Sequence, residues 1–368
     1  MIKYLKNIKR RQFLKIGSIG LLGTSYGSTL NQIVTRSSID RLYDNALVID
    51  AMSLGRSWDS DELKALNDTG YSGIHTSLAN KTWDSALSSI RDWNQRIENN
   101  PGIFLRALVS SHFLQAKEEK RVAVLYGHQN ATMIEDKIDR LDTLHQLGTR
   151  CIQLTYNHRN LIGDGCTERT NAGLSDFGLM VVKRMNKLGL IIDLSHCGKK
   201  TTYDAIRYSD APPCFTHTMC ESLYPGHPRA KTDDQLEHIA RNGGMIGITA
   251  LGYFVGSDPG GKTNIETYLD HIDHAVRLVG VDHVGLSSDF QIQGIRPWAT
   301  RENWYEPRLK SFKSSYNVKW PPWIPELDST DRFLNVTYEL FKRGYSDSAI
   351  RKILGLNWMR YFEQIIGL

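Results

Sequence analysis

The chain lacks the features that would place it in a specialised class of protein. Its 368 residues contain no internal repeat and no low-complexity segment. A hydrophobic fraction of 40% and a charged fraction of 23% show no bias toward disorder, collagen or a disulfide scaffold. These absences leave a chain that can bury one large core, so we expect a single large domain.

Cysteine is scarce and is not spaced for metal binding. The five cysteines form no C-x-x-C pair and no zinc-ribbon pattern, so we expect most of them to be small buried residues. An oxidising compartment permits a disulfide, but the odd number leaves at least one cysteine unpaired within the chain. The cysteines are Cys151, Cys166, Cys197, Cys214 and Cys220.

Acidic residues are absent before Asp40, whereas six basic residues lie in the first fifteen positions. Without those six, the formal net charge of +5 becomes −1. The positive charge therefore belongs to a leader and not to a binding face, and we expect no nucleic-acid partner. The six residues are Lys3, Lys6, Lys9, Arg10, Arg11 and Lys15.

The leader also lacks an apolar run long enough to span a bilayer. The paired Arg10 and Arg11 precede a short, glycine-rich apolar stretch at 16–23. This pattern resembles a twin-arginine export signal and predicts a signal and linker over residues 1–38, the twin-arginine export machinery as a partner, and a periplasmic or cell-envelope location. A basic amphipathic helix is the alternative. No clear cleavage site follows, so removal or retention as an anchor stays open.

Short apolar runs alternate with longer amphipathic stretches in the remainder of the chain. This alternation is typical of parallel strands covered by helices, and it predicts an α/β fold, a (β/α)₈ TIM barrel over residues 39–368. Nine runs are available for eight barrel positions, and we expect Phe104–Val109 to be the one outside the barrel. The runs are Ala46–Asp50, Gly73–Leu78, Phe104–Val109, Val122–Tyr126, Cys151–Asn157, Leu190–His196, Pro213–His217, Met245–Thr249 and Val284–Asp289.

Helix signals support the same order. A helix is predicted after Ser175, which is a typical N-cap, and before Gly189. Another begins after Thr232 and ends near Asn242.

A tryptophan-rich insertion follows the last predicted strand. Residues 296–324, hereafter the flap, carry four tryptophans among prolines and charges and show no regular period. We interpret this segment as a cover over the barrel mouth. A surface loop that buries its aromatic side chains against helices is the alternative.

Three side chains with metal-binding or acid–base capacity stand at the carboxyl ends of predicted strands. They are His196, His217 and Asp289. In a barrel these ends converge on one mouth, where active sites are built. Two histidines and a carboxylate there favour a divalent metal, with zinc as our prediction, and an open position for water. A single histidine alone would more often be a core or surface residue.

Several separated motifs resemble the renal (membrane) dipeptidase family of zinc peptidases, in order and nearly in spacing. The similarity covers most of residues 40–368. The motifs are Leu190–His196, Thr216–His217, His227–Arg229, Thr232–Gln235, Gly243–Ile248, Asp270–Asp273, Gly280–Phe290 and Ile353–Arg360.

The resemblance implies an amidohydrolase-like barrel that cleaves dipeptides with two bridged zinc ions. By position, His196 and His217 match the two histidines of one metal. Arg229 matches the arginine that holds the substrate carboxylate, and Asp289 matches the acid–base aspartate beside the metal. A guanidinium can bind a carboxylate through two parallel N–H···O hydrogen bonds, so an arginine suits this role.

The chain departs from the family at the first strand. The family has Asp-Gly-His-x-Asp there, whereas this chain has Met52 and Leu54 at the two ligand positions. The bridging glutamate corresponds to Gln129, a doubtful ligand because a neutral amide bridges two cations poorly. Glu135 could substitute only if its loop bends back. We therefore expect one zinc ion and doubt a second.

Another departure is Tyr156, where the family often has a histidine that stabilises the oxyanion. Its hydroxyl could donate a hydrogen bond in the same role, both to substrate and to the developing charge. Packing against flap tryptophans is the alternative.

Three functions remain open. The first is an exported metallo-dipeptidase that acts on a small peptide-like substrate with a free carboxylate. The second is a catalytically inactive family member that binds a peptide-like ligand. The third is a metal-dependent hydrolase of a non-peptide amide or lactone. The oligomeric state is not determined by the sequence, and a homodimer stays open.

Overall fold

The computed structural model describes residues 37–55 and 57–368. The predicted export signal and linker therefore lie outside the described residues, except for positions 37 and 38. Those two positions begin a helix that covers residues 37–45. Among the described residues, no helix is both long and apolar enough to cross a membrane.

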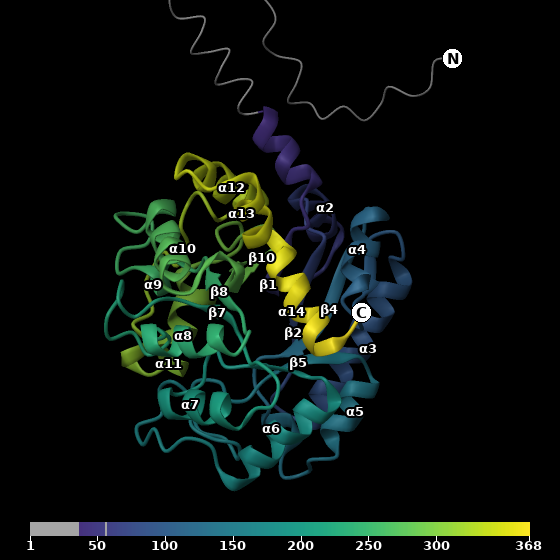
Figure 1. Cartoon of the computed structure of the whole chain (residues 1–368), viewed down its shortest axis with the longest axis vertical. Helices are drawn as coiled ribbons and strands as arrows, with labels where there is room; N and C mark the ends of the chain where they lie inside the picture. The colour runs from purple at the N-terminus through teal and green to yellow at the C-terminus, as the bar shows by residue number, and fades with distance from the viewer. Residues whose placement is uncertain (1–36, 56) are drawn as a thin grey trace, which may run out of the picture.

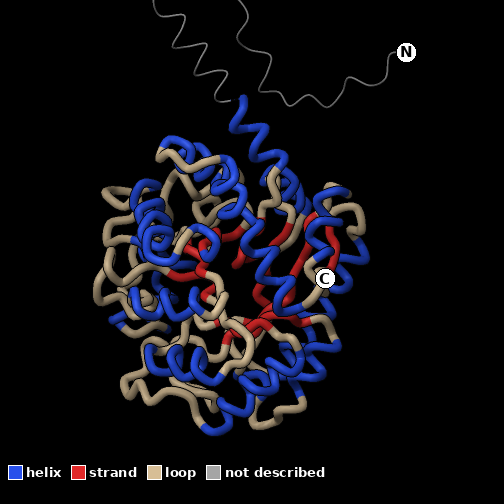
Figure 2. Tube along the Cα trace, in the orientation of Figure 1, coloured by secondary structure: helices blue, strands red, loops and turns tan. Residues whose placement is uncertain are grey.

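Eight parallel strands form the centre of the molecule (Figure 2). They fall into two hydrogen-bonded groups, β1-β2-β4-β5-β6 and β7-β8-β9. All pairings within both groups are parallel. The strands are β1 (Ile49–Leu54), β2 (Gly73–Leu78), β4 (Val122–His128), β5 (Thr149–Gln153), β6 (Ile191–Asp193), β7 (Phe215–Thr218), β8 (Ile246–Thr249) and β9 (Val284–Ser287).

Two junctions join the groups into a ring. Between β6 and β7, Asp193 forms a parallel bridge with Cys214. After β9 the chain continues into β10 (Phe290–Gln291), which pairs in parallel with β1. The amide of Asp289 also donates to the carbonyl oxygen of Met52 at 2.8 Å. The strands are thus arranged as the (β/α)₈ barrel that the sequence predicts.

The ninth apolar run lies outside the barrel, as predicted. It forms β3 (Phe104–Arg106), which pairs with the first residues of β4 and leaves the rest of that edge to β5. The first strand, however, was predicted too early. It begins at Ile49 and continues past Asp50. The buried Asp50 carboxylate lies within this strand and accepts from Ser288 N and Oγ at 2.8 and 2.5 Å.

Helices surround the strands (Figure 1). Both predicted helices are confirmed: the Ser175 side chain caps α6, Gly189 ends it in the left-handed conformation, and Thr232 caps α8. The helices are α2 (Ser60–Thr69), α3 (Trp83–Asn99), α4 (Ser111–Glu118), α5 (Arg140–Gln146), α6 (Asp176–Leu188), α7 (Lys199–Tyr208), α8 (Asp233–Arg241), α9 (Gly252–Val255), α10 (Ile265–Val279), α11 (Glu306–Ser311), α12 (Arg332–Lys342), α13 (Asp347–Arg351) and α14 (Asn357–Ile366).

The C-terminal helix α14 closes one end of the barrel. Its Trp358 is fully buried in an apolar cluster with residues that precede or begin strands, among them Ile191, Cys214 and Met245. A Cβ atom at Gly285 would lie 2.3 Å from the indole nitrogen of Trp358, so a larger residue there would collide with the helix. Function must therefore use the opposite end, where the strands have their carboxyl termini.

The flap folds over that opposite end. It contains a π-helix (Arg301–Tyr305), α11 and a 3₁₀ turn (Ser314–Tyr316). Two hydrogen bonds hold it to barrel loops: Lys313 Nζ donates to the carbonyl of Thr167 at 2.6 Å, and the His227 ring donates to the carbonyl of Tyr316 at 3.1 Å. The interpretation of this segment as a cover is confirmed.

All five cysteines are free, and four of them are buried. No disulfide therefore contributes to the fold within the described residues.

Candidate functional site

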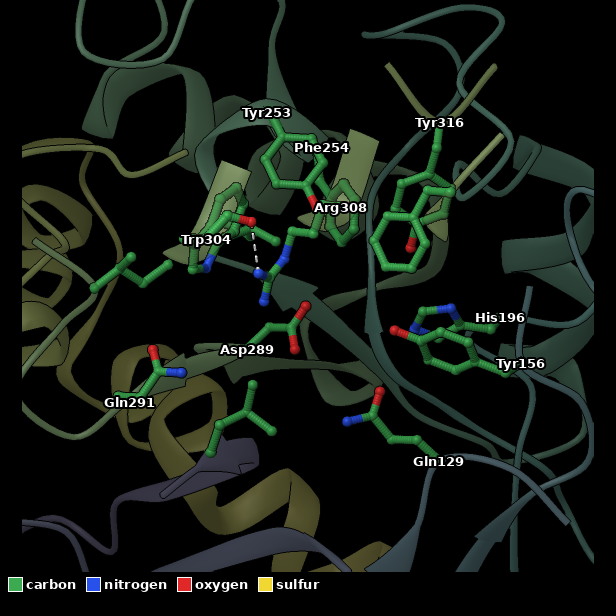
Figure 3. Close-up of a pocket in the computed structure, with 14 residues that line it drawn as sticks. Gln129, Tyr156, His196, Tyr253, Phe254, Asp289, Gln291, Trp304, Arg308 and Tyr316 are labelled. Atoms are coloured by element: carbon green, nitrogen blue, oxygen red, sulfur yellow. Dashed lines mark hydrogen bonds between the residues drawn. The ribbon is translucent and has the colours of Figure 1, made fainter. Parts of the chain in front are cut away.

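A cavity of about 100 Å³ opens at the barrel mouth beneath the flap. Its floor comes from residues at strand ends and its roof from the flap and α9 (Figure 3). The floor includes four residues singled out in the sequence: Gln129, Tyr156, His196 and Asp289. The remaining lining residues are Leu54, Leu251, Tyr253, Phe254, Gln291, Ile295, Trp304, Arg308, Phe312 and Tyr316.

The two predicted metal-binding histidines face each other. The Nε2 atoms of His196 and His217 lie 3.0 Å apart, and both side chains are buried. His196 follows β6 and His217 lies on β7, so the barrel brings together residues 21 positions apart. The two imidazoles therefore lie within reach of a common ion, although His196 lines the cavity and His217 does not.

The tautomer of His196 is set by Asn157. The Nδ1 atom of His196 lies 2.8 Å from the side-chain oxygen of Asn157. An amide oxygen only accepts hydrogen bonds, so Nδ1 must carry the proton. The Nε2 atom of His196 then presents a lone pair.

The tautomer of His217 is set by Thr216 and Asp193. The hydroxyl of Thr216 donates to the Asp193 carboxylate at 2.7 Å, which uses its single proton. Its oxygen lies 2.8 Å from Nδ1 of His217, so it can only accept there and Nδ1 must donate. The Nε2 atom of His217 also presents a lone pair.

Two lone pairs that face each other at 3.0 Å repel, and a cation between or beside them would remove that repulsion. A proton is disfavoured, because burial and the charge of Arg229 lower the pKa of both histidines well below the ordinary value. Zinc binds imidazole nitrogen at about 2.0–2.1 Å, so two ligands of one ion lie within about 4 Å of each other. The pair therefore fits a single ion.

The site does not fit a cluster of two ions. Over residues 37–55 and 57–368, no group of three or more His, Cys, Asp and Glu side chains is placed to hold a metal, so Asp289 does not join the histidine pair as the predicted third ligand and no ligand set for a second ion is present. Met52 Sδ accepts from the Gln129 amide at 3.3 Å, and Leu54 lines the cavity. An isobutyl group and a thioether engaged with an amide thus occupy the positions of the missing ligands.

Glu135 does not replace the missing glutamate. Its side chain is half exposed and pairs with Arg140 at 3.1 Å, away from the lining of the cavity. The amide of Gln129 instead reaches into the cavity from the end of β4 (Figure 3).

Asp289 is the one carboxylate among the described residues that line the cavity. It adopts a left-handed conformation with φ of 54°, uncommon outside glycine, and such conformations concentrate at functional sites. Desolvation raises its pKa to about 7, and Arg229 opposes this rise. A carboxyl group with that pKa can both take up and release a proton near neutrality.

Tyr156 lies flat against the His196 ring. The ring centroids are 4.0 Å apart with an interplanar angle of 21°. Burial raises the pKa of Tyr156, so the hydroxyl stays protonated and can donate a hydrogen bond into the cavity. Its packing partner is a histidine and not the flap tryptophans considered from the sequence.

Arg229 lies beside the two histidines but does not line the cavity. Its guanidinium is fully buried and donates to the carbonyl oxygens of Ser195 and His217, in the second case at 2.9 Å. The Nε–H has no partner among the described residues. Arg229 therefore braces the segments that carry both imidazoles, and its predicted role in holding a carboxylate stays a prediction.

Apart from Trp304, which is one of the four flap tryptophans, the roof residues Arg308, Tyr253 and Phe254 were not singled out in the sequence. Arg308 and Trp304 come from the flap, whereas Tyr253 and Phe254 come from α9. Arg308 is one of several cations in an aperiodic segment, and no spacing distinguishes it from Arg301 or its other neighbours. Its place in the cavity depends on how the flap folds back.

Comparisons with known proteins identify relatives of this chain. The family model for membrane dipeptidases, peptidase family M19, matches residues 50–300. The dipeptidase verJ of Clonostachys rogersoniana is 30% identical over 261 residues, which are 70% of this chain and 59% of that protein. The chain thus spans about three fifths of this relative's length.

Solved structures show the same fold. An amidohydrolase from Pseudomonas aeruginosa is 28% identical with a TM-score of 0.80, over 90% of this chain and 99% of that one. A metallopeptidase from Rhodobacter sphaeroides, solved with a phosphinate mimic of the dipeptide L-Ala-D-Ala, is 19% identical with a TM-score of 0.71, over 87% and 99%. With the family model covering more than half of its length, this chain belongs to the membrane dipeptidase family.

Proposed function

We propose that this protein is an exported, metal-dependent hydrolase that cleaves a dipeptide, or a related small amide with a free carboxylate, using a single zinc ion. One observation carries the proposal. At the barrel mouth, His196 in the cavity lining and His217 buried behind it aim unprotonated Nε2 atoms at each other across 3.0 Å. Family membership and the named dipeptidase relative support the reaction class.

The chain's own residues divide the chemistry. His196 and His217 would hold the ion, which when bound supplies a Lewis acid that polarises the amide carbonyl and activates water. Asp289 takes the proton from the attacking water and returns it to the leaving amine. Tyr156 donates a hydrogen bond to the oxygen on which negative charge develops. Gln129, which also lies on the floor of the cavity, provides an uncharged amide oxygen.

Elemental analysis combined with turnover of L-Ala-D-Ala tests the proposal. Protein purified without chelator and supplied with zinc should hold up to one ion per chain, and His196→Ala and His217→Ala should each hold none. His238→Ala, which removes a partly exposed histidine on α8, should bind metal like the wild type. A wild-type protein that takes up no metal would contradict this function.

A second function, ligand binding without hydrolysis, is favoured by Met52, Leu54 and Gln129. These residues replace charged or imidazole ligands of the family and leave fewer donors for catalysis. Thermal stabilisation by L-Ala-D-Ala without any release of alanine would favour binding alone. Measurable cleavage by metal-loaded protein, lost in His196→Ala, would exclude it.

Export is part of the proposal. Arg10 and Arg11 ahead of a short apolar stretch support the twin-arginine route to the cell envelope. Fractionation of cells into cytoplasm and envelope tests this, and a purely cytoplasmic protein would argue against it.

A further inference from the structure

The cavity under the flap carries opposite charges on its two sides. Arg308, from α11 in the roof, is the one permanent cation among the described residues that line it. Figure 3 shows its guanidinium pointing down from the roof toward the Asp289 carboxylate on the floor. A substrate between roof and floor would contact both groups.

The guanidinium of Arg308 is held in place but keeps most of its donors. It lies 3.8 Å from the centroid of the Trp304 ring, and Nη1 donates to the Trp304 carbonyl at 2.9 Å. A guanidinium has five N–H donors, and this is the one hydrogen bond that the guanidinium of Arg308 makes within the described residues. The stacking restricts its orientation before any ligand arrives, which lowers the entropic cost of binding.

Arg229 is in the opposite situation. Both of its terminal nitrogens donate to backbone carbonyls, and its guanidinium is fully buried behind the cavity wall. Two-point recognition of a carboxylate needs two free N–H groups on one edge of the guanidinium. Two of the five N–H donors of Arg229 already bond these carbonyls, and the buried group does not line the cavity, so a carboxylate in the cavity would not reach it without displacing the segments around His196 and His217.

We propose that Arg308, presented by the flap, is the residue that binds the free carboxylate of the substrate, and that Arg229 is a positioning residue for the two histidines. This inference rests on the proposed function for its substrate class, a dipeptide-like molecule with a terminal carboxylate. The flap is then the part of the protein that selects acids over their neutral analogues. Among the described residues, the strand ends supply no permanent positive charge to the lining of the cavity.

Binding of L-Ala-D-Ala and of its C-terminal carboxamide to the metal-loaded full-length protein tests the inference. Calorimetry should show tighter binding of the acid. Arg308→Gln should weaken binding of the acid by about 10- to 100-fold, the usual effect of losing a charge-assisted hydrogen-bonded pair. It should leave the carboxamide nearly unchanged. Arg308→Lys keeps the charge without the planar fork, so we expect an intermediate loss.

Arg301→Gln is the matched control. Arg301 lies in the same flap and over the rings of Tyr305 and Trp320, but it is exposed and does not line the cavity. It should change neither affinity, whereas a general disturbance of the flap would weaken both. Circular dichroism of every variant checks folding.

Each outcome separates the inference from the proposed function. A wild-type protein that binds the acid no better than the carboxamide, or binds neither, overturns the inference. An equal loss of affinity for the acid and the carboxamide in Arg308→Gln overturns the inference as well. Unchanged affinity of this variant for the acid also overturns it. Binding that prefers the acid and depends on Arg308 supports the inference. If no cleavage follows, the result refutes only the proposed hydrolysis.

Discussion

The hydroxyl of Thr216 stands between Asp193 and His217, and its single proton goes to the carboxylate. The amide oxygen of Asn157 has the matching place behind His196. Neither residue lines the cavity, yet together they determine which nitrogen of each imidazole is free to bind a metal. Single residues behind the site therefore decide its chemistry.

Thr216→Val tests this arrangement. The variant keeps the shape of the side chain but removes the acceptor for His217 Nδ1–H. The tautomer with a lone pair on Nε2 is then no longer favoured. Replacement of such a supporting partner typically weakens metal affinity by about 10- to 100-fold. We expect a zinc titration to show that loss, and Thr216→Ser, which retains the hydroxyl, to show little. Equal zinc affinity of the Val and Ser variants would disprove the role of the hydroxyl.

The residues of the site were predictable to different degrees. His196, His217 and Asp289 follow apolar runs, so strand ends alone placed them at one mouth. Arg229 was found by motif, but the sequence could not show that both of its terminal nitrogens donate to backbone carbonyl oxygens. Arg308 carried no signal, because its segment has no period and its position depends on a stack against Trp304.

Among the elements, the barrel strands and their helices reflect local rules. The capping box at the start of α10 is an example: Asn264 accepts from the amides of Glu266 and Thr267 at 3.0 and 3.3 Å, and the Thr267 hydroxyl accepts from the Asn264 amide. The helix then buries Tyr268, Leu269 and Ile272 against the core. Such signals are readable because donor and acceptor are close in the chain.

Asn264→Ala should destabilise the protein by about 1 kcal/mol, since it removes a side-chain cap from two amides. Asn264→Asp keeps a capping oxygen and should stay close to the wild type. Urea unfolding followed by circular dichroism measures the difference. Identical midpoints for the Ala and Asp variants would mean that the cap contributes nothing.

The flap is the element that sequence rules describe least. Its helices are short, and its attachment uses contacts over long distances, such as Lys313 with Thr167 and His227 with Tyr316. Aperiodic composition indicated a cover over the mouth. It could not indicate which side chains of that cover point inward.

For the whole molecule, buried histidines predict a loss of stability in acid. His271 is fully buried, with Nδ1 accepting from the Cys220 amide and Nε2–H donating to the Val255 carbonyl. Burial lowers its pKa from 6.5 to about 4, and burial together with Arg229 lowers that of His227 to about 3. The unfolded chain therefore binds more protons below pH 6.5, so stability falls as the pH drops from 6.5 toward 4.

Between pH 7 and 4.5, His271 alone should contribute a loss of roughly 2 to 3 kcal/mol in the free energy of unfolding. Urea unfolding at a series of pH values measures this loss, and His271→Gln, which does not titrate, should show a smaller one. A loss of the same size in His271→Gln and in the wild type would contradict the prediction.

By itself the sequence determined the barrel, its strand order, the cap of each predicted helix and the strand ends at which His196, His217 and Asp289 stand. These features depend on periodicity and on residues close together in the chain. Only the tertiary structure decided that the two imidazoles aim bare nitrogens at each other, that Arg229 is engaged by backbone, and that Arg308 enters the cavity. Those outcomes depend on hydrogen bonds and stacking between side chains whose directions are set only when the barrel and the flap have packed together.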